Sequence, residues 1–447
     1  MSLVSQSLDY KSIDISYPTY HLSKVSSQLP LPDISVSGGN ESIFELPPKV
    51  MNLGKSILSF TATVPSTGGI ASYVHADGLS FIRQIQLYTR QGLFLADINA
   101  CNYYTKAVNR RSNKISDVQS YDVAVGGADN SGYFTGIQCS NIAVAAGNAG
   151  GRPDNTAAKT NFLEPAYTIV GVRNKEGPAI SVQVPLSRIV DSIVGMDKDQ
   201  FFGESVYLRI VWTPSVDIAF TATEANDPKT GDALLATPIT IDSLLFYAAI
   251  EQNQVIVQSL VDRYKSGTLS YNIPYIHMNT VSLAAGTNNI STRYSSPFGH
   301  RLQRVLWCPF LNDGAAAGTY GKYDNSNMIV GGNATKVSSF YTMVNNVRTT
   351  QFDYNRKLGN EWMVAKDRLV GSSILSSDEF YYNFVHYEDF TGSLTTNHDP
   401  NLEEGLLLSE GEIKYDIQAN TEVNLSHYVF AVTLRKLTLS PTGATLI

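Results

Sequence analysis

The sequence predicts an all-β protein that folds as two β-sandwiches in tandem. Three observations lead to this prediction. The chain of 447 residues is long enough for two large all-β domains. Short β-rich runs bounded by Gly and Pro recur along it, and one helical segment divides them near the middle. Only 16% of the residues are charged, which suits sheets whose outer faces pack against neighbours.

The first 40 residues differ from the rest because they are polar and rich in serine. Pro30, Pro32 and the pair Gly38-Gly39 interrupt any regular element that could form there. The segment 1–40 is therefore predicted to be an N-terminal arm without a core of its own, which becomes ordered when it docks on a neighbour.

The first sandwich is predicted over residues 41–250. Gln91-Gly92 separates two short β-rich runs, which indicates a hairpin. Leu186, Ile189, Val190 and Ile193 have helical spacing and predict a short helix. Residues 124–160 are rich in Gly, Ala and Asn and predict a large exposed loop. Strands are expected at 42–46, 57–64, 81–88, 93–98, 180–184, 206–212 and 243–250.

A change of hydrophobic period marks the expected domain boundary. Between Glu251 and Tyr264 the apolar residues recur at steps of three and four, which predicts an amphipathic helix that ends before Gly267. The segment 251–267 is therefore predicted to be a linker helix between the two sandwiches.

The second sandwich is predicted over residues 268–447, with a strand at its C-terminal end. Strands are expected at 269–278, 304–308, 337–347, 379–387, 413–417 and 427–439. Two Gly- and Asn-rich segments, 311–335 and 392–412, predict long loops.

No histidine cluster has the spacing of a metal site. The most metal-like group is His386-Tyr387-Glu388-Asp389, but successive side chains of a strand point to opposite faces and are not expected to converge. His398-Asp399-Pro400 is expected to form a turn. The sequence therefore predicts no metal-binding residue.

Signatures of catalysis and cofactor binding are also missing from the sequence. It has no Gly-x-Ser-x-Gly motif, and Cys101, Cys139 and Cys308 are too few and too far apart for a disulfide framework. Cys308 lies in an apolar run and is expected in the core. The other segments considered are predicted to be loops, turns or aromatic packing: Gly318–Lys322, Asp197–Asp199, Asn401–Gly405 and Tyr381–Phe384. The prediction is a protein without enzymatic activity, catalytic residues or cofactors.

Charge and hydropathy narrow the class of protein further. The net charge is -7, and no basic arm is present, so sequence-specific nucleic-acid binding is not expected. No apolar run approaches the length of a membrane span, and no secretory signal precedes the first strand. We therefore expect a protein that is made and used inside a cell.

Several short segments, taken in order, are similar to one protein family. They are Ile43–Pro48, Ile57–Val64, Phe81–Leu87, Val184–Leu186, Phe246–Asn253, Arg304–Phe310 and Tyr341–Arg348. In this order and layout, residues 41–440 resemble the double jelly-roll major capsid proteins, in particular those of polinton-like viruses and virophages.

The resemblance implies a fold and a function. Each half would be an eight-stranded jelly roll, and three chains would form a pseudo-hexagonal capsomer that tiles the icosahedral shell of a DNA virus. Such a protein resides in the virion after assembly in the host cell. Its implied partners are further copies of itself, penton and minor capsid proteins, and a membrane or other layer beneath the shell. The long loops would build the outward towers.

Other readings of the sequence stay open. Two β-sandwiches also fit a glycan-binding protein of the lectin or fibre type, which would grip sugars through surface aromatic residues. A β-sandwich hydrolase with a dispersed site is a second alternative. A minor or penton capsid protein is a third, although those are usually shorter single jelly rolls. The mass in solution separates the major capsid protein from these alternatives, because only the capsomer requires a trimer.

Overall fold

The structure is a computed structural model of the 447-residue chain. It describes residues 18–35, 40–63, 72–74, 78–112, 179–215, 219–221, 233–234, 238–283, 289–295, 300–311, 336–351, 354–355, 386–391, 405–407, 412–420 and 425–447. The predicted loop at 124–160 lies outside these residues, as do the first 17 residues. The predicted loops at 311–335 and 392–412 also lie outside them, except for 311, 405–407 and 412, of which 311, 406, 407 and 412 belong to strands.

The first half of the described chain is mostly strand. Its helical elements are η1 (Gly78–Phe81), α2 (Cys101–Ser112) and η2 (Leu186–Arg188). Its strands are β1 (Tyr20–Ser26), β2 (Asp33–Ile34), β3 (Glu41–Leu46), β4 (Met51–Thr63), β5 (Ser72–Val74), β6 (Ile82–Thr89), β7 (Phe94–Asn99), β8 (Ala179–Pro185), β9 (Asp199–Gln200), β10 (Val206–Trp212), β11 (Ala219–Thr221), β12 (Ala233–Leu234) and β13 (Ile239–Glu251).

The second half follows helix α7 (Gln254–Lys265) and is also built from strands. They are β14 (Leu269–Leu283), β15 (Asn289–Ser295), β16 (Arg301–Leu311), β17 (Lys336–Val344), β18 (Val347–Arg348), β19 (Tyr354–Asn355), β20 (His386–Asp389), β21 (Leu406–Leu407), β22 (Glu412–Asn420), β23 (Leu425–Ser440) and β24 (Gly443–Leu446).

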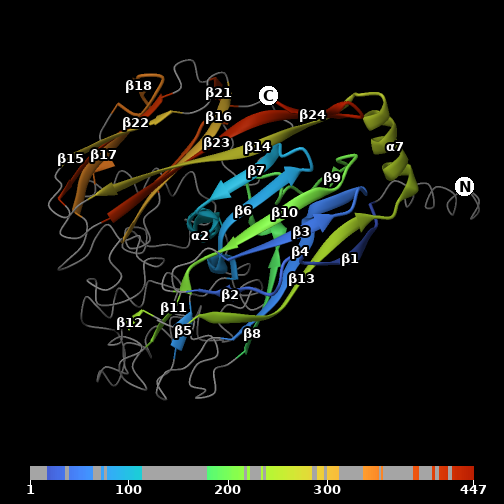
Figure 1. The fold of residues 1–447 in the computed structure, drawn as a ribbon. Coiled ribbons are helices and arrows are strands. Elements are labelled where there is room, and N and C mark those ends of the chain that lie inside the picture. Colours follow the sequence, from blue (N-terminus) through green and yellow to red (C-terminus); the bar gives the residue numbers. More distant parts are fainter. Residues whose placement is uncertain are drawn as a thin grey trace, which may run out of the picture.

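The strands form two sandwiches, one on each side of α7 in the sequence (Figure 1). The first has sheets ordered β1-β13-β4-β8 and β3-β10-β6-β7, and the second has sheets ordered β14-β23-β16-β20 and β15-β22-β17-β18. Within the described residues, no strand before α7 pairs with a strand after it. Each half therefore contributes two principal paths of four strands, as the prediction of two eight-stranded jelly rolls requires.

Alternation of apolar and polar residues explains why these segments form strands. In β10, Val206, Leu208, Ile210 and Trp212 are buried, and the residues between them are partly exposed. Trp212 packs edge-on against Phe60 of β4, with ring centroids 5.2 Å apart. Full burial of a large apolar side chain of this kind contributes about 1.5–3 kcal/mol. The buried residues on one face of each core strand therefore hold that strand against the core.

The hairpin predicted around Gly92 is confirmed. Strands β6 and β7 pair in antiparallel register, for example Ile85 with Ile98. Gly92 has a φ of 85°, a left-handed conformation that glycine adopts without a steric penalty.

The helix predicted before Gly267 is also confirmed, with a later start. Helix α7 begins after Asn253, whose side chain accepts a hydrogen bond from the backbone N–H of Val255. Glu251 stays in β13, where it pairs with Tyr20. The helix is followed by Gly267, which has a φ of 69°.

The prediction of an arm without a core is wrong for residues 20–34. All seven residues of β1 pair with β13, and Ile34 is buried in the core of the first roll. The pairing satisfies the backbone N–H and C=O groups along the edge of β13, which would otherwise be exposed and unpaired. A polar strand of this kind is stabilised by its ladder and shows little hydrophobic pattern in the sequence.

The short helix predicted at 186–193 is also wrong in its form. The segment makes only the 3₁₀ turn η2, and Asp191 then adopts a φ of 56°, which ends any helical path. Leu186, Ile189 and Ile193 are nevertheless buried, so the apolar pattern reports burial and not helical structure. No helix in the described part of the chain is long and apolar enough to cross a membrane.

Removing β1 tests its place in the first roll. We expect deletion of residues 1–27 to lower the thermal midpoint and to promote aggregation, because the edge of β13 becomes exposed. Deletion of residues 1–17 keeps the whole β1–β13 ladder and serves as the control. Equal midpoints for the two truncated chains, measured by differential scanning fluorimetry, would contradict this role of β1.

Candidate functional site at the interface between the rolls

The sheet β14-β23-β16-β20 has packed side chains on both of its faces. Successive residues of a strand point to opposite sides. One set of β23 residues, including Tyr428 and Phe430, faces helix α2 of the first roll. The other face carries Glu388 of β20, which accepts a hydrogen bond from Thr342 of β17 in the opposite sheet of the second roll. This sheet therefore belongs to the core of its own sandwich and also forms the interface with the first roll.

Helix α2 supplies the aromatic part of the interface. Tyr103 stacks on Tyr428 with ring centroids 4.5 Å apart, and Tyr104 meets Phe430 edge-on at 5.1 Å. Aromatic pairs contribute about 0.5–1.5 kcal/mol beyond the area they bury. The sequence analysis did not identify this helix. The spacing of the buried residues Cys101, Tyr104 and Val108 on one helical face was the available signal.

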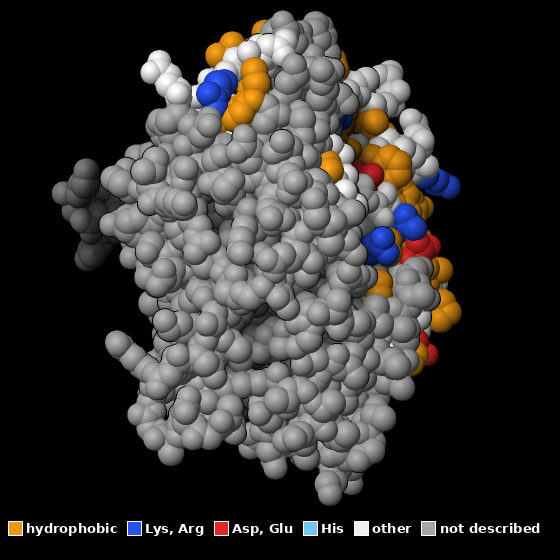
Figure 2. All heavy atoms as spheres, turned by 90° about the vertical axis from the view of Figure 1, so that its left-hand side faces the viewer, with side chains coloured by type: hydrophobic (Ala, Val, Ile, Leu, Met, Phe, Trp, Pro, Cys, Tyr) orange, Lys and Arg blue, Asp and Glu red, His pale blue; other side chains and the backbone are white. Residues whose placement is uncertain are grey.

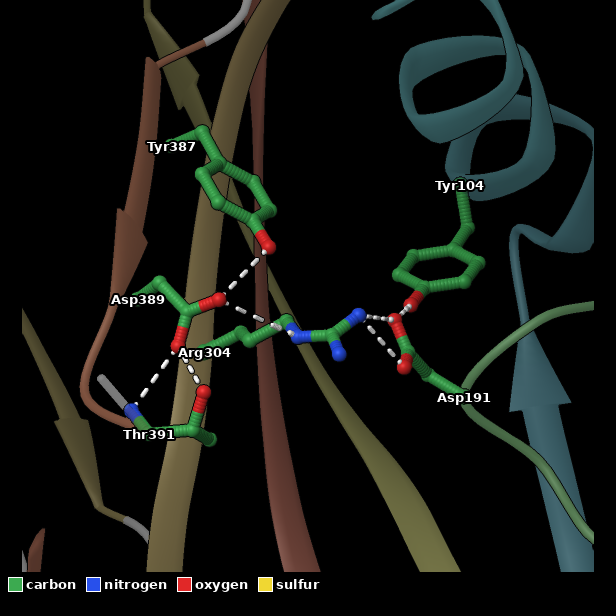
Figure 3. A network of polar contacts seen from close by, with 6 residues as sticks. All are labelled: Tyr104, Asp191, Arg304, Tyr387, Asp389 and Thr391. Carbon is green, nitrogen blue, oxygen red and sulfur yellow. Dashed lines mark hydrogen bonds and ion pairs between the residues drawn. The ribbon is translucent and has the colours of Figure 1, made fainter. Parts of the chain in front are cut away.

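A buried ion pair lies beside these rings and joins the two rolls (Figure 3). The Nη1 of Arg304, on β16, donates to both carboxylate oxygens of Asp191 in the first roll, at 2.7 and 2.9 Å. The hydroxyl of Tyr104 donates to the same carboxylate at 2.6 Å. The Arg304 side chain is fully buried and that of Asp191 is 6% exposed, so solvent screens this pair very little.

A second carboxylate completes the network within the second roll (Figure 3). Asp389 Oδ2 lies 3.7 Å from Arg304 Nε and accepts a hydrogen bond from the Tyr387 hydroxyl at 3.1 Å. Its other oxygen accepts from the backbone N–H and the hydroxyl of Thr391, at 2.8 and 2.5 Å. One guanidinium thus lies between two carboxylates whose oxygens are held by further donors.

The pKa values of these groups shift as their burial and charges dictate. Burial alone would lower the pKa of Arg304, but the charge of Asp191 and the neighbouring Tyr387, Tyr104 and Asp389 outweigh it and raise that pKa. Burial, and then the charge of Asp191, raises the pKa of Tyr104 well above its ordinary value. The guanidinium stays charged and the phenol stays neutral across the physiological range.

A third set of contacts joins both the linker helix and strand β14 to Phe201 of the first roll. The hydroxyl of Tyr271, on β14, accepts a hydrogen bond at 3.1 Å from the backbone N–H of Phe201 in the first roll. The Phe201 ring packs edge-on against Tyr264 of α7, with centroids 5.2 Å apart. Gly203 has a φ of 74°, and a Cβ there would lie 2.1 Å from the Tyr264 ring, so only glycine allows this approach.

The structure corrects the interpretation of the segment 386–389. The adjacent carboxylates of Glu388 and Asp389 point to opposite faces, as expected, but His386 and Glu388 share one face, and their Nε2 and Oε1 atoms lie 3.1 Å apart. Residues two apart on a strand are neighbours on the same side. Both side chains are buried. Within the described residues, no three His, Cys, Asp or Glu side chains could hold a metal ion.

The acidic pair at 197–199 is also more than a solvated turn. The hydroxyl of Tyr20 donates to Asp199 at 2.9 Å, and the side-chain amide of Asn52 donates to Asp197 at 2.8 Å. Burial raises the pKa of Asp199. These contacts hold the beginning of β1 against the first roll.

The remaining residues considered in the sequence fall into two groups. Cys308 is buried in the core of the second roll, as expected, and Cys101 is buried at the start of α2. The others lie outside the described residues: Cys139, Gly318–Lys322, Tyr381–Phe384, His398–Pro400 and Asn401–Glu404.

Comparison with solved structures identifies the fold. The chain is similar to the Faustovirus major capsid protein, with a TM-score of 0.58, 9% identity, and coverage of 95% of this chain and 91% of that chain. It is similar to a chain of the Sputnik virophage structure, with a TM-score of 0.58, 11% identity, and coverage of 97% and 88%. It is also similar to a chain of the PBCV-1 virus capsid, with a TM-score of 0.57, 11% identity, and coverage of 96% and 97%.

These matches extend over nearly the whole of each chain, so the protein has the double jelly-roll fold. No protein-family model and no curated protein matches its sequence.

Replacing Arg304 tests whether the ion pair holds the rolls together. We expect Arg304→Met to lower the free energy of unfolding by about 3–5 kcal/mol, because two buried carboxylates lose their cation. Arg301→Met is the matched control on the same strand, since Arg301 is exposed and makes only a long hydrogen bond to the Gly405 carbonyl. The measurement is urea unfolding at neutral pH.

A double variant separates the interaction energy of the ion pair from the effects of each single substitution. Asp191→Leu combined with Arg304→Met removes both charges, so it is expected to cost less than the sum of the two single changes. Additive losses, or equal stabilities of Arg304→Met and Arg301→Met, would contradict the proposed role of the pair.

Proposed function

We propose that the chain is a structural major capsid protein whose trimers form pseudo-hexagonal capsomers that tile an icosahedral viral shell. The observation that carries this proposal is the double jelly-roll architecture, matched along nearly its whole length by a viral major capsid protein and a virus capsid chain. In the proposal the protein resides in the virion and has no enzymatic activity.

The interface between the rolls supports a structural role. A shell subunit must transmit load across its full width, and here the two rolls share a buried ion pair, stacked tyrosines and a clamped linker helix. The division of the chain is part of the proposal. The first roll extends from residue 20 to 251, the linker from 252 to 267, and the second roll from 268 to 447.

Exposed apolar residues of the second roll are suited to contacts with neighbouring copies. Val347 in the β17–β18 hairpin is 68% exposed, and Leu406 and Leu407 of β21 are 39% and 53% exposed. The side chain of Asn345 donates to the Leu407 carbonyl at 3.0 Å, so the hairpin and β21 are neighbours. Figure 2 shows hydrophobic and basic side chains close together at the top of the molecule. We infer that this patch, Val347 with Leu406 and Leu407, lies in a subunit contact.

Other parts of the proposal follow from shell assembly. The partners are further copies of the chain, penton and minor capsid proteins, and a membrane or other layer beneath the shell. Trimer formation would bury on the order of several thousand Å² per chain, in the range of obligate assemblies. No contact in the described residues favours the glycan-binding alternative.

The mass of the purified chain tests this function. We expect a stable trimer by light scattering at micromolar concentration, because an obligate interface of this size does not dissociate under those conditions. A chain that stays monomeric under all assembly conditions would contradict the proposal.

Charge substitutions in the apolar patch test the contact itself. Val347→Asp together with Leu407→Asp should weaken association of subunits or capsomers and leave the thermal midpoint of the isolated subunit unchanged, since both side chains are exposed. Val255→Asp, an equally exposed apolar position on α7, is the matched control. Unchanged association in the double variant would exclude the patch from the subunit contacts.

A further inference from the structure

Three histidines lie on the face of sheet β14-β23-β16-β20 that points away from the first roll. His427 is on β23, His386 on β20 and His277 on β14. Their register partners lie on the same face of the sheet. His386 pairs with Trp307, and His277 pairs with Ala431. This face meets the second sheet of the same roll, where Thr342 of β17 bonds to Glu388. His386, bonded to Glu388, therefore lies beside the contact between the two sheets of the second roll, and His427 and His277 are on the same face.

His427 is the most deeply buried of the three, with 1% of its surface exposed. Its ring stacks on Trp307 with centroids 5.2 Å apart and planes 16° apart. Within the part of the chain that the structure describes, neither ring nitrogen has a hydrogen-bond partner. Its register neighbours Val281 and Pro309 offer no charge. Burial lowers its pKa to about 3.

Glu388, a carboxylate on this face, is engaged through one oxygen, and its Oε2 is buried without a hydrogen-bond partner in the described residues. Glu388 Oε1 lies 3.1 Å from His386 Nε2 and accepts hydrogen bonds from the hydroxyls of Thr342 and Thr349. Burial alone would raise the pKa of Glu388, but His386 and the two hydroxyls outweigh burial and lower it. The Trp307 ring contacts both His386 and His427. A proton on His427 would therefore enter a buried site in which, within the described residues, neither ring nitrogen has a hydrogen-bond acceptor.

His277 faces positive charge instead of negative charge. Its Nε2 lies 3.3 Å from Nη2 of Arg435, whose guanidinium stacks 4.0 Å above the Tyr275 ring. Burial, then Arg435 and His300, lowers the pKa of His277 to about 3. No described charged group contributes to the shift of His427, and the pair of His386 and Glu388 is linked to it only through the Trp307 ring. The described groups around His277 are Arg435, His300 and Tyr275, and Asp97 of the first roll acts on Tyr275.

We propose that the second roll contains an acid-sensitive opening device, in which protonation of His427 and His277 separates its two sheets while sheet β14-β23-β16-β20 stays bound to the first roll. The two faces of that sheet differ in the required way. The face toward the first roll holds its cation, Arg304, between the carboxylates of Asp191 and Asp389. On the opposite face, neither ring nitrogen of His427 has a hydrogen-bond partner in the described residues, and His277 lies beside the guanidinium of Arg435. A proton on either histidine therefore acts on the face that points away from the first roll.

The direction of the effect follows from linkage. In the unfolded or opened state each histidine takes up a proton near its ordinary pKa of about 6.5. In the closed state the pKa of both is about 3. Each histidine thus stabilises the closed state fully above pH ~6.5, and this stability is lost as the pH falls from there toward about 3.

Hydrogen–deuterium exchange as a function of pH tests the location of the opening. After correction for intrinsic exchange rates, strands β15, β17 and β22 should lose protection between neutral and mildly acidic pH, while β16, β23 and the first roll keep theirs. Opening that begins in the first roll, or protection that is independent of pH, would overturn the proposal.

Substitution of the histidines tests the cause. His427→Phe keeps an aromatic ring on Trp307 but takes up no proton, so the number of protons bound on opening should fall by about one. His21→Gln on β1 is the control, since His21 is exposed and should leave that number unchanged. His277→Gln is the second variant and should also remove about one proton, which keeps the test decisive if His427→Phe does not fold. An unchanged number of protons in either folded variant contradicts the proposal.

Discussion

Burial of one sheet on both faces is the constraint on which the rest of this structure depends. Sheet β14-β23-β16-β20 closes the second sandwich with one face and packs on the first roll with the other. A sheet exposed to solvent on one side holds polar residues there at little cost, whereas a polar residue on either face of this sheet is buried and is costly unless it is paired. Residues 302–308 of β16 and 429–434 of β23 are all buried and must fit one of two cores, so the two rolls are not independent units.

Polar and aromatic contacts contribute to this interface in different ways. The rings of Tyr103, Tyr104 and Phe430 provide burial, which is insensitive to small shifts. The pair of Arg304 and Asp191 is directional, because a buried guanidinium must meet its carboxylates in good geometry or destabilise the protein. The network therefore fixes how the rolls are oriented. A buried charge needs a partner, and this need also explains why protonation of the histidines on the opposite face of the sheet would destabilise the second roll.

The sequence predicted the parts of the fold that depend on local pattern. Strands such as Val206–Trp212 and the linker helix show their periods directly. Strand β1 was missed because a polar strand depends on its partner β13. The ion pair was missed because Asp191 and Arg304 are 113 positions apart. One signal was present: a lone arginine within the apolar run Arg304–Phe310 must find a carboxylate if that run is a core strand.

Calorimetry at neutral pH tests most directly the claim that the shared sheet makes the two rolls one cooperative unit. The account predicts a single transition in which the calorimetric and van't Hoff enthalpies agree, because neither roll can lose the sheet without exposing the other. Two resolved transitions, one for each roll, would contradict it.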